Sequence, residues 1–110
     1  MRYVLDSATI VEFGTYSYFP LTHRQACAWV ATGSYLPFLG DETTCQAFGE
    51  LFNITPPKVN SQTVRMNSGD EALVIRLELP EDYLPDSGGK PKFDMDFVVQ
   101  HSELGLLRKL

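Results

Sequence analysis

Residues 63–79, which read TVRMNSGDEALVIRLEL, carry the clearest structural signal in the chain. The residues on either side of Asn67-Ser68-Gly69-Asp70 have the composition of strands, and these four residues have the composition of a tight turn. The segment therefore predicts a β-hairpin, with strands at Thr63–Met66 and Glu71–Leu79.

The second strand of this hairpin has one apolar face and one mixed face. Successive side chains of a strand point to opposite sides of a sheet. One side receives Leu73, Ile75, Leu77 and Leu79, and the other receives Ala72, Val74, Arg76 and Glu78. We expect the side with Arg76 and Glu78 to face solvent, a partner or a ligand.

Helices are expected upstream of the hairpin. Thr22 and Gln25 have the spacing of a capping box, and Gly33 provides a stop for the helix that they begin. Asp41 is a suitable N-cap for a second helix, which ends near Asn53.

The remaining segments complete one domain of strands and helices. Strands are expected at Tyr3–Leu5, at Thr15–Phe19 with Pro20 as its end, at Ser34–Leu39 on an edge, and at Phe93–Val98, with a loop from Pro80 to Pro91. The expected fold is α/β (α+β), a single domain over residues 1–110. It has a mixed, mainly antiparallel β-sheet of about five strands, with two main helices packed on it.

Composition excludes several classes of function. The chain has 9 Lys and Arg residues and 14 Asp and Glu residues, which gives a formal net charge of −5 at pH 7. Coating of duplex DNA needs a basic stripe, so direct duplex binding is not expected. No apolar run has the length of a signal peptide or a membrane span, so we expect a cytoplasmic protein without a membrane anchor. Cys27 and Cys45 have apolar neighbours and are expected to be reduced, buried thiols.

Standard catalytic arrangements are absent from the sequence. The chain has no Walker loop, no dinucleotide-binding glycine pattern, no HExxH and no CxxC. His23 opens the first helix and His101 lies near the end of a strand, where both are expected to be solvated or capping residues. Neither cysteine is placed next to a histidine, so no thiol nucleophile is predicted.

The segment that stands out chemically is Gly40-Asp41-Glu42-Thr43-Thr44, at the start of the second helix. Free N–H groups and the helix dipole make a helix N-terminus attractive to phosphate groups. The carboxylate of Asp41 is expected to occupy these donors as the N-cap, so that it competes with an anion and repels it.

Several short motifs follow one another along nearly the whole chain. They are Gly14-Thr15-Tyr16, the helix start at Leu21–Ala26, the strand–Gly40–helix turn, Val59-Asn60, Gly69–Val74, Leu79-Pro80-Glu81 and Gly105-Leu106-Leu107. In this order they resemble the viral type III anti-CRISPR ring nuclease family of archaeal viruses, phages and mobile elements. The resemblance implies a homodimer of small ring-nuclease-like domains. Family members degrade cyclic tetra-adenylate without a metal, by directing a ribose 2′-hydroxyl onto its neighbouring phosphate.

Several family positions carry different residues in this chain. Asp41 stands where the family has a histidine general acid, and Ser61 and Glu78 stand where it has arginines. Asp6 replaces an asparagine, whereas Glu81 matches the family glutamate. A carboxylate repels a phosphate by roughly 1–4 kcal/mol at a separation of about 4 Å. We therefore expect that the fold is kept and the family reaction is lost.

Three functions remain open. The first is a catalytically inactive counter-defence protein that binds a host defence protein or another ligand. The second is a metal-dependent phosphodiesterase, in which Asp6, Asp41, Glu78 and Glu81 hold Mg²⁺ or Mn²⁺. The third is sequestration of a cyclic nucleotide messenger without cleavage. The expected ligand-binding residues are Asp6, Ser7, Gly40, Asp41, Glu42, Thr43, Thr44, Asn60, Gln62 and Glu81, with no resident metal or cofactor.

Overall fold

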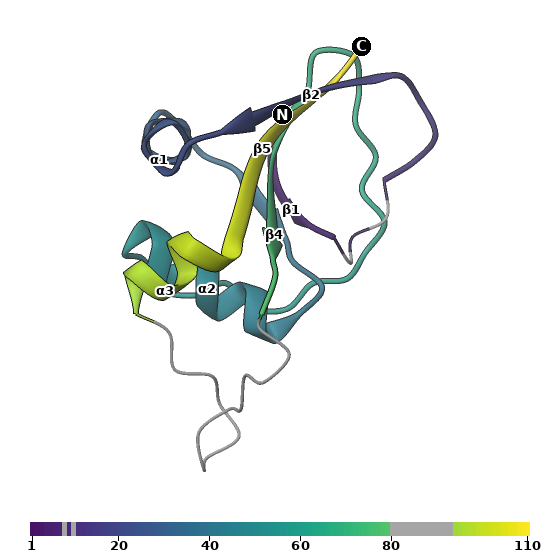
Figure 1. The fold of residues 1–110 in the computed structure, drawn as a ribbon. Helices are drawn as coiled ribbons and strands as arrows, with labels where there is room; N and C mark the ends of the chain where they lie inside the picture. The colour runs from purple at the N-terminus through teal and green to yellow at the C-terminus, as the bar shows by residue number, and fades with distance from the viewer. Residues whose placement is uncertain (8, 10, 80–93) are drawn as a thin grey trace.

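The sheet is built on both sides of β1 (Arg2–Asp6). In the computed structural model, which describes residues 1–7, 9, 11–79 and 94–110, β1 pairs in parallel with β3 (Leu36–Phe38) and with β4 (Glu71–Leu77). β5 (Ser102–Lys109) pairs antiparallel with β4 and with β2 (Tyr16–Leu21). The strand order is therefore β2-β5-β4-β1-β3 (Figure 1).

This architecture confirms the predicted α+β class. The sheet has five strands and is mixed, with parallel and antiparallel pairings. The helices are α1 (His23–Ala31), α2 (Glu42–Phe52) and α3 (Met95–His101), of which the first two are the predicted main helices. In the part of the chain that the structure describes, no helix is long and apolar enough to cross a membrane.

The helices cover one face of the sheet. Phe48 and Leu51 of α2 pack in one cluster with Val4, Leu73 and Ile75 from β1 and β4. Phe48 is completely buried and lies at the centre of a group of aromatic rings. This cluster is the main core of the protein.

Irregular chain covers the opposite face. Val11, Val64 and Met66 pack there against Tyr3 and Leu5 of β1. Val11 and Val64 also form an isolated parallel bridge. Val11, between β1 and β2, and Val64 and Met66, between α2 and β4, thus lie on the side of the sheet away from the helices (Figure 1).

The predicted hairpin is wrong, although its turn and its second strand are present. A turn forms at Ser68-Gly69, where Gly69 has a φ of +90°, and β4 follows it. Among the described residues, Val64 is the one member of Thr63–Met66 that makes a β-bridge, and its partner is Val11. β4 uses both of its hydrogen-bonding edges for β1 and β5, which leaves no edge for residues 63–66.

Two further strand predictions need correction. Residues 95–98 are helical rather than extended, because the carboxylate of Asp94 accepts the N–H of Phe97 at 2.8 Å and caps α3. Strand β2 continues past Pro20 to Leu21, since a proline without an N–H is tolerated on an edge strand. Phe93 and the predicted loop from Pro80 to Pro91 lie outside the described residues.

Candidate functional site

β1 and β3 end side by side, which brings together residues far apart in the sequence. Leu5 is level with Phe38, and the two strands run in the same direction. Asp6 therefore lies next to the chain that passes through Gly40 into α2. Ligands commonly bind at the carboxyl ends of parallel strands and at helix N-termini. We name the following residues the carboxyl-end cluster: Asp6, Thr9, Gly40, Asp41, Thr44 and Asn60.

Asp6 is the buried centre of the carboxyl-end cluster and is 5% exposed. Its Oδ2 accepts the backbone N–H of Gly40 at 2.8 Å, and its Oδ1 accepts the hydroxyl of Thr9 at 2.8 Å. The N–H of Gly40 is the donor that a strand–glycine–helix turn can offer to an anion. In this protein that donor is already bonded to an internal carboxylate.

Thr9 is a member of the cluster that sequence patterns did not single out. Its hydroxyl contacts both Asp6 and the carbonyl oxygen of Phe38, so it links the ends of β1 and β3. The backbone N–H of Thr9 also donates to the carbonyl oxygen of Asp6 at 3.1 Å. The signal that could have identified Thr9 is its position three residues after Asp6, a spacing at which short polar side chains bond locally.

Asp41 occupies the N-cap position of α2, as predicted, but its side chain does not accept a capping hydrogen bond. Its Oδ2 instead accepts the hydroxyl of Thr44 at 3.1 Å. The prediction that the carboxylate of Asp41 accepts the free N–H groups of the helix is therefore wrong. The carboxylate remains at the helix N-terminus, beside Glu42 in the first turn, so negative charge still accumulates there.

The pKa of the Cys45 thiol is raised by burial and by this negative charge. Burial is the main cause that raises its pKa to about 11, and the charges of Asp6, Asp41 and Glu42 act in the same direction. Cys45 is buried, and its Sγ donates to the carbonyl oxygen of Leu39 at 3.9 Å. The start of α2 is thus an environment that disfavours further negative charge.

The segment 60–62 lies against the same turn. The N–H of Asn60 donates to the carbonyl oxygen of Leu39 at 2.9 Å, and the N–H of Gln62 donates to Oδ1 of Asn60 at 3.4 Å. Ser61 is exposed between them. Ser7 is exposed after β1, and Thr43 is half-buried in the first turn of α2. The structure therefore gathers candidate residues from the end of β1, the start of α2 and residues 60–62.

Glu78 makes its contacts elsewhere. Its carboxylate lies 3.2 Å from the guanidinium of Arg76, and its backbone N–H donates to the carbonyl oxygen of His101 at 2.7 Å. Glu81 lies outside the described residues. Among the residues that the structure does describe, no three His, Cys, Asp or Glu side chains form a group that could hold a metal ion. The metal-dependent alternative therefore gains no support from Asp6, Asp41 and Glu78.

The surroundings of His23 and Cys27 differ from the prediction. His23 and Cys27 lie one turn apart on α1, and Nε2 of His23 is 3.4 Å from Sγ of Cys27. His23 is half-buried rather than solvated, because the same Nε2 lies 3.0 Å from the carbonyl oxygen of Leu51. The signal for this pair is the i, i+4 spacing within a predicted helix. His101, at the end of α3, packs its ring against Phe97.

Residues 2–83 match the sequence model of the STIV B116-like family, and this match spans more than half of the chain. The chain belongs to the STIV B116-like family. Its structure is similar to that of B116 of Sulfolobus turreted icosahedral virus, with a TM-score of 0.71 and 17% sequence identity over 97% of each chain. No curated protein matches the sequence. At this identity, the likeness to B116 concerns the shared fold.

Proposed function

We propose that this STIV B116-like protein is a catalytically inactive, ring-nuclease-like counter-defence protein. It acts as a homodimer in the host cytoplasm, by binding a host defence protein or another ligand. Two facts support a viral role: the motif order resembles the anti-CRISPR ring nucleases, and the family is named after a viral protein. The observation that carries the loss of catalysis is the 2.8 Å hydrogen bond from Gly40 to Asp6.

Because of this hydrogen bond, the backbone N–H that could bind a phosphate is already occupied by a carboxylate of the protein itself. A phosphate that took the N–H of Gly40 would leave the carboxylate of Asp6 buried and without that donor, which costs more than a hydrogen bond lost on the surface. Asp41 and Glu42 add negative charge at the same helix end, and each repels a phosphate by roughly 1–4 kcal/mol at about 4 Å. The family's histidine general acid is also replaced by Asp41.

A cleavage assay tests the loss of the reaction. The purified protein is incubated with cyclic tetra-adenylate, and we expect no products above the buffer control. Cleavage that Asp41→Ala abolishes would overturn the proposal.

Calorimetry tests whether the negative charges of this cluster weaken the binding of a phosphate-bearing ligand. Asp6→Asn and Asp41→Asn should each raise the affinity for cyclic tetra-adenylate by about tenfold, because each removes one repelling charge. Glu50→Gln is the matched control, since it removes a charge from the exposed surface of α2 away from its N-terminus and should leave the affinity unchanged. An equal gain in all three variants would mean that net charge, and not this cluster, sets the affinity.

An infection assay tests the counter-defence role. Cells with an active type III CRISPR system are challenged with a targeted virus, with and without expression of the protein. We expect expression to increase the number of plaques without any fall in the cyclic tetra-adenylate concentration. Unchanged plaque numbers would contradict a counter-defence role, and a fall in the messenger would indicate cleavage or sequestration instead.

Sequestration of a messenger is the second candidate, and the position of residues 60–62 favours it. Asn60 and Gln62 lie beside the Gly40 turn, where their amide groups could contact bases or ribose. Calorimetric titration with cyclic di-, tri- and tetranucleotides separates this candidate from protein binding. One ligand with sub-micromolar affinity would place sequestration first.

Light scattering and thermal unfolding complete the tests. Size exclusion with light scattering should give twice the mass of the chain if the protein is a homodimer.

Thermal unfolding tests metal binding. A metal that binds only the folded state must raise the melting temperature, and we expect no change with Mg²⁺, Mn²⁺ or EDTA. A rise with one metal would revive the metal-dependent alternative.

A further inference from the structure

His23 and Cys27 form a pair outside the carboxyl-end cluster. Both face the C-terminal end of α2, since His23 contacts Leu51 and Cys27 lines a cavity with Leu51 and Phe52. Nε2 of His23 is 3.4 Å from Sγ of Cys27. The ring of His23 also packs against the ring of Phe52, with 6.1 Å between centroids. Cys27 is therefore a half-buried thiol with a positioned imidazole beside it.

The contact with Leu51 fixes the hydrogen on the imidazole. A carbonyl oxygen only accepts, so Nε2 of His23, at 3.0 Å from the carbonyl oxygen of Leu51, carries a hydrogen. The one hydrogen on Nε2 is directed at Leu51, and Sγ of Cys27, 3.4 Å from the same nitrogen, can only share it. The imidazole is thus a polar neighbour of Sγ, and Cys27 is the nucleophilic group of the pair.

Cys27 opens into a cavity of about 520 Å³, which is within the usual size range of small-molecule sites. The described residues that line it are His23, Cys27, Val30, Ala31, Tyr35, Leu51, Phe52, Asn53, Ile54 and Met95. None of these is a lysine, arginine, aspartate or glutamate. The cavity therefore suits a compound with an uncharged, apolar body.

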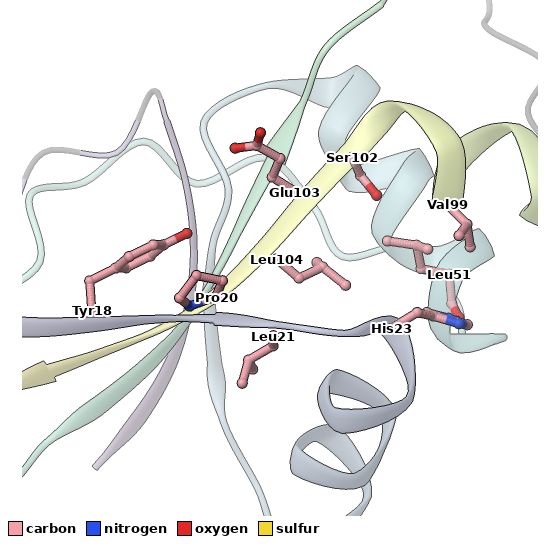
Figure 2. A pocket seen from close by; sticks show the side chains of 9 residues that line it. All are labelled: Tyr18, Pro20, Leu21, His23, Leu51, Val99, Ser102, Glu103 and Leu104. Atoms are coloured by element: carbon pink, nitrogen blue, oxygen red, sulfur yellow. The ribbon is translucent and has the colours of Figure 1, made fainter.

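A second cavity lies on the other side of His23. It has a volume of about 440 Å³ and shares His23 and Leu51 with the first (Figure 2). Tyr18, Ser102 and Glu103 give this second cavity a more polar lining. His23 therefore lines both cavities, whereas Cys27 lines the first, apolar cavity.

We propose that the apolar cavity is a covalent binding site for small electrophiles with an apolar body, such as α,β-unsaturated carbonyl compounds, and that Cys27 is its nucleophile. The sulfur of Cys27 adds to the β-carbon of the double bond and forms a carbon–sulfur bond. The π electrons move to the α-carbon, which takes a proton from water, and the thiol proton passes to water. The sum is addition of S–H across the double bond, with no leaving group and no oxidant.

The two cysteines of the native protein give the first test. The protein is treated with a limiting amount of N-benzylmaleimide and the adduct is located by mass spectrometry. We expect a single adduct on Cys27, because Cys45 is buried, lines neither cavity and has a pKa raised to about 11 by burial and by nearby carboxylates. Labelling of Cys45 at an equal or greater rate would overturn the proposal.

Kinetics of two maleimides test the cavity and the imidazole. Cys27→Ser combined with Ala28→Cys moves the thiol to an exposed position of the same helix, and this variant is the matched control. The rate ratio of N-benzylmaleimide to N-ethylmaleimide should be higher at Cys27 than at this control thiol.

Two substitutions of His23 test the imidazole. His23→Phe keeps an aromatic ring but removes the N–H, and it should slow the reaction at Cys27 by about fivefold. His23→Gln retains a donor and should recover part of the rate. Equal ratios at the two thiols, or no effect of His23→Phe, would each refute the proposal.

Discussion

Asp70 shows how one buried carboxylate ties distant parts of the chain together. Its Oδ1 accepts the ammonium of Met1 at 2.9 Å, and its Oδ2 accepts the backbone N–H of Asn67 at 2.8 Å. The hydrogen bond from the ammonium is the largest cause that lowers the pKa of Asp70, followed by the bond from Asn67. The side chain therefore holds the start of β1 against the turn that precedes β4.

Asp70→Asn should lower the free energy of unfolding by about 1–3 kcal/mol at pH 7, because the neutral amide loses the charge-assisted contact with the ammonium. The native pKa of Asp70 lies below its value in the unfolded chain, which is about 3.9. The contribution of Asp70 is then fully present above that value and is lost as the pH falls through the native pKa. Urea unfolding at pH 7 and at pH 2.5 measures both effects.

The control for this prediction is Glu50→Gln, which removes an exposed carboxylate from α2. It should change the free energy of unfolding by no more than about 0.5 kcal/mol at either pH. A difference between the native protein and Asp70→Asn that stays constant down to pH 2.5 would show that the charge of Asp70 does not carry the effect.

At the scale of single residues, the sequence predicts which residues lie near one another better than it predicts the hydrogen bonds between them. Asp6, Gly40 and Asp41 could be placed near one another from the strand–glycine–helix pattern and the motif resemblance. The contacts between them could not, because they depend on the register between β1 and β3. The pair of His23 and Cys27 needs only the helical spacing of four residues, so it was predictable and was missed.

The capping box of α1 is an element whose sequence signal and structure agree. The Oγ1 of Thr22 accepts the N–H of Gln25 at 3.1 Å, and the Oε1 of Gln25 accepts the N–H of Thr22 at 2.9 Å. Thr22→Ala should lower the free energy of unfolding by about 0.5–2 kcal/mol, measured by chemical unfolding. Thr22→Ser keeps the hydroxyl and should retain most of the stability. Equal losses in both variants would point to packing of the threonine methyl group rather than to capping.

Local signals succeed for the starts of α1 and α2, and they fail for α3 and for the pairing of strands. The capping box of α1 lies within four residues, and Asp41 marks the N-cap position of α2 although its side chain makes no capping hydrogen bond. The alternation in Phe93–Val98 resembles a strand, but the contact of Asp94 with Phe97 makes Met95–His101 a helix. The hairpin failed for a different reason: β4 pairs with β1 and β5, which are distant in sequence. No local pattern around Glu71 records which strands those are.

Across the whole molecule, stability depends chiefly on the cluster under the helices. Phe48 is completely buried there, and its ring lies 4.9 Å from that of Phe52 and 6.0 Å from that of Tyr35. Phe48→Ala should lower the free energy of unfolding by about 3–5 kcal/mol, because it leaves a cavity in the core. Since a domain of this kind is stable by only about 5–15 kcal/mol, a large part of its stability should be lost.

Phe13 provides the matched control for this prediction. Its relative exposure is 107%, so Phe13→Ala removes the same side chain without opening a cavity. Thermal unfolding of both variants should show a large fall in melting temperature for Phe48→Ala and almost none for Phe13→Ala. Similar falls in both would mean that Phe13 is packed in solution, for example against another copy of the chain.

The fold class was predictable at this scale, whereas the strand order was not. Alternating polarity and capping signals are enough to indicate one sheet with helices, and composition indicates one core of modest size. The order β2-β5-β4-β1-β3 depends on which apolar faces meet across the chain. α2 packs on β1 and β4, and no single segment encodes that contact.

The strand order also has a consequence for the folding rate. Among the described strands, β2 pairs with β5 alone, although almost the whole chain separates Tyr16 from Lys109. The two parallel ladders of β1 likewise join it to strands far downstream. Closing such long loops costs entropy before any contact repays it, so proteins with distant pairings fold slowly, in milliseconds to seconds. Until β5 is in place, β2 has no edge to pair with, so β2 joins the sheet only after the final strand of the chain.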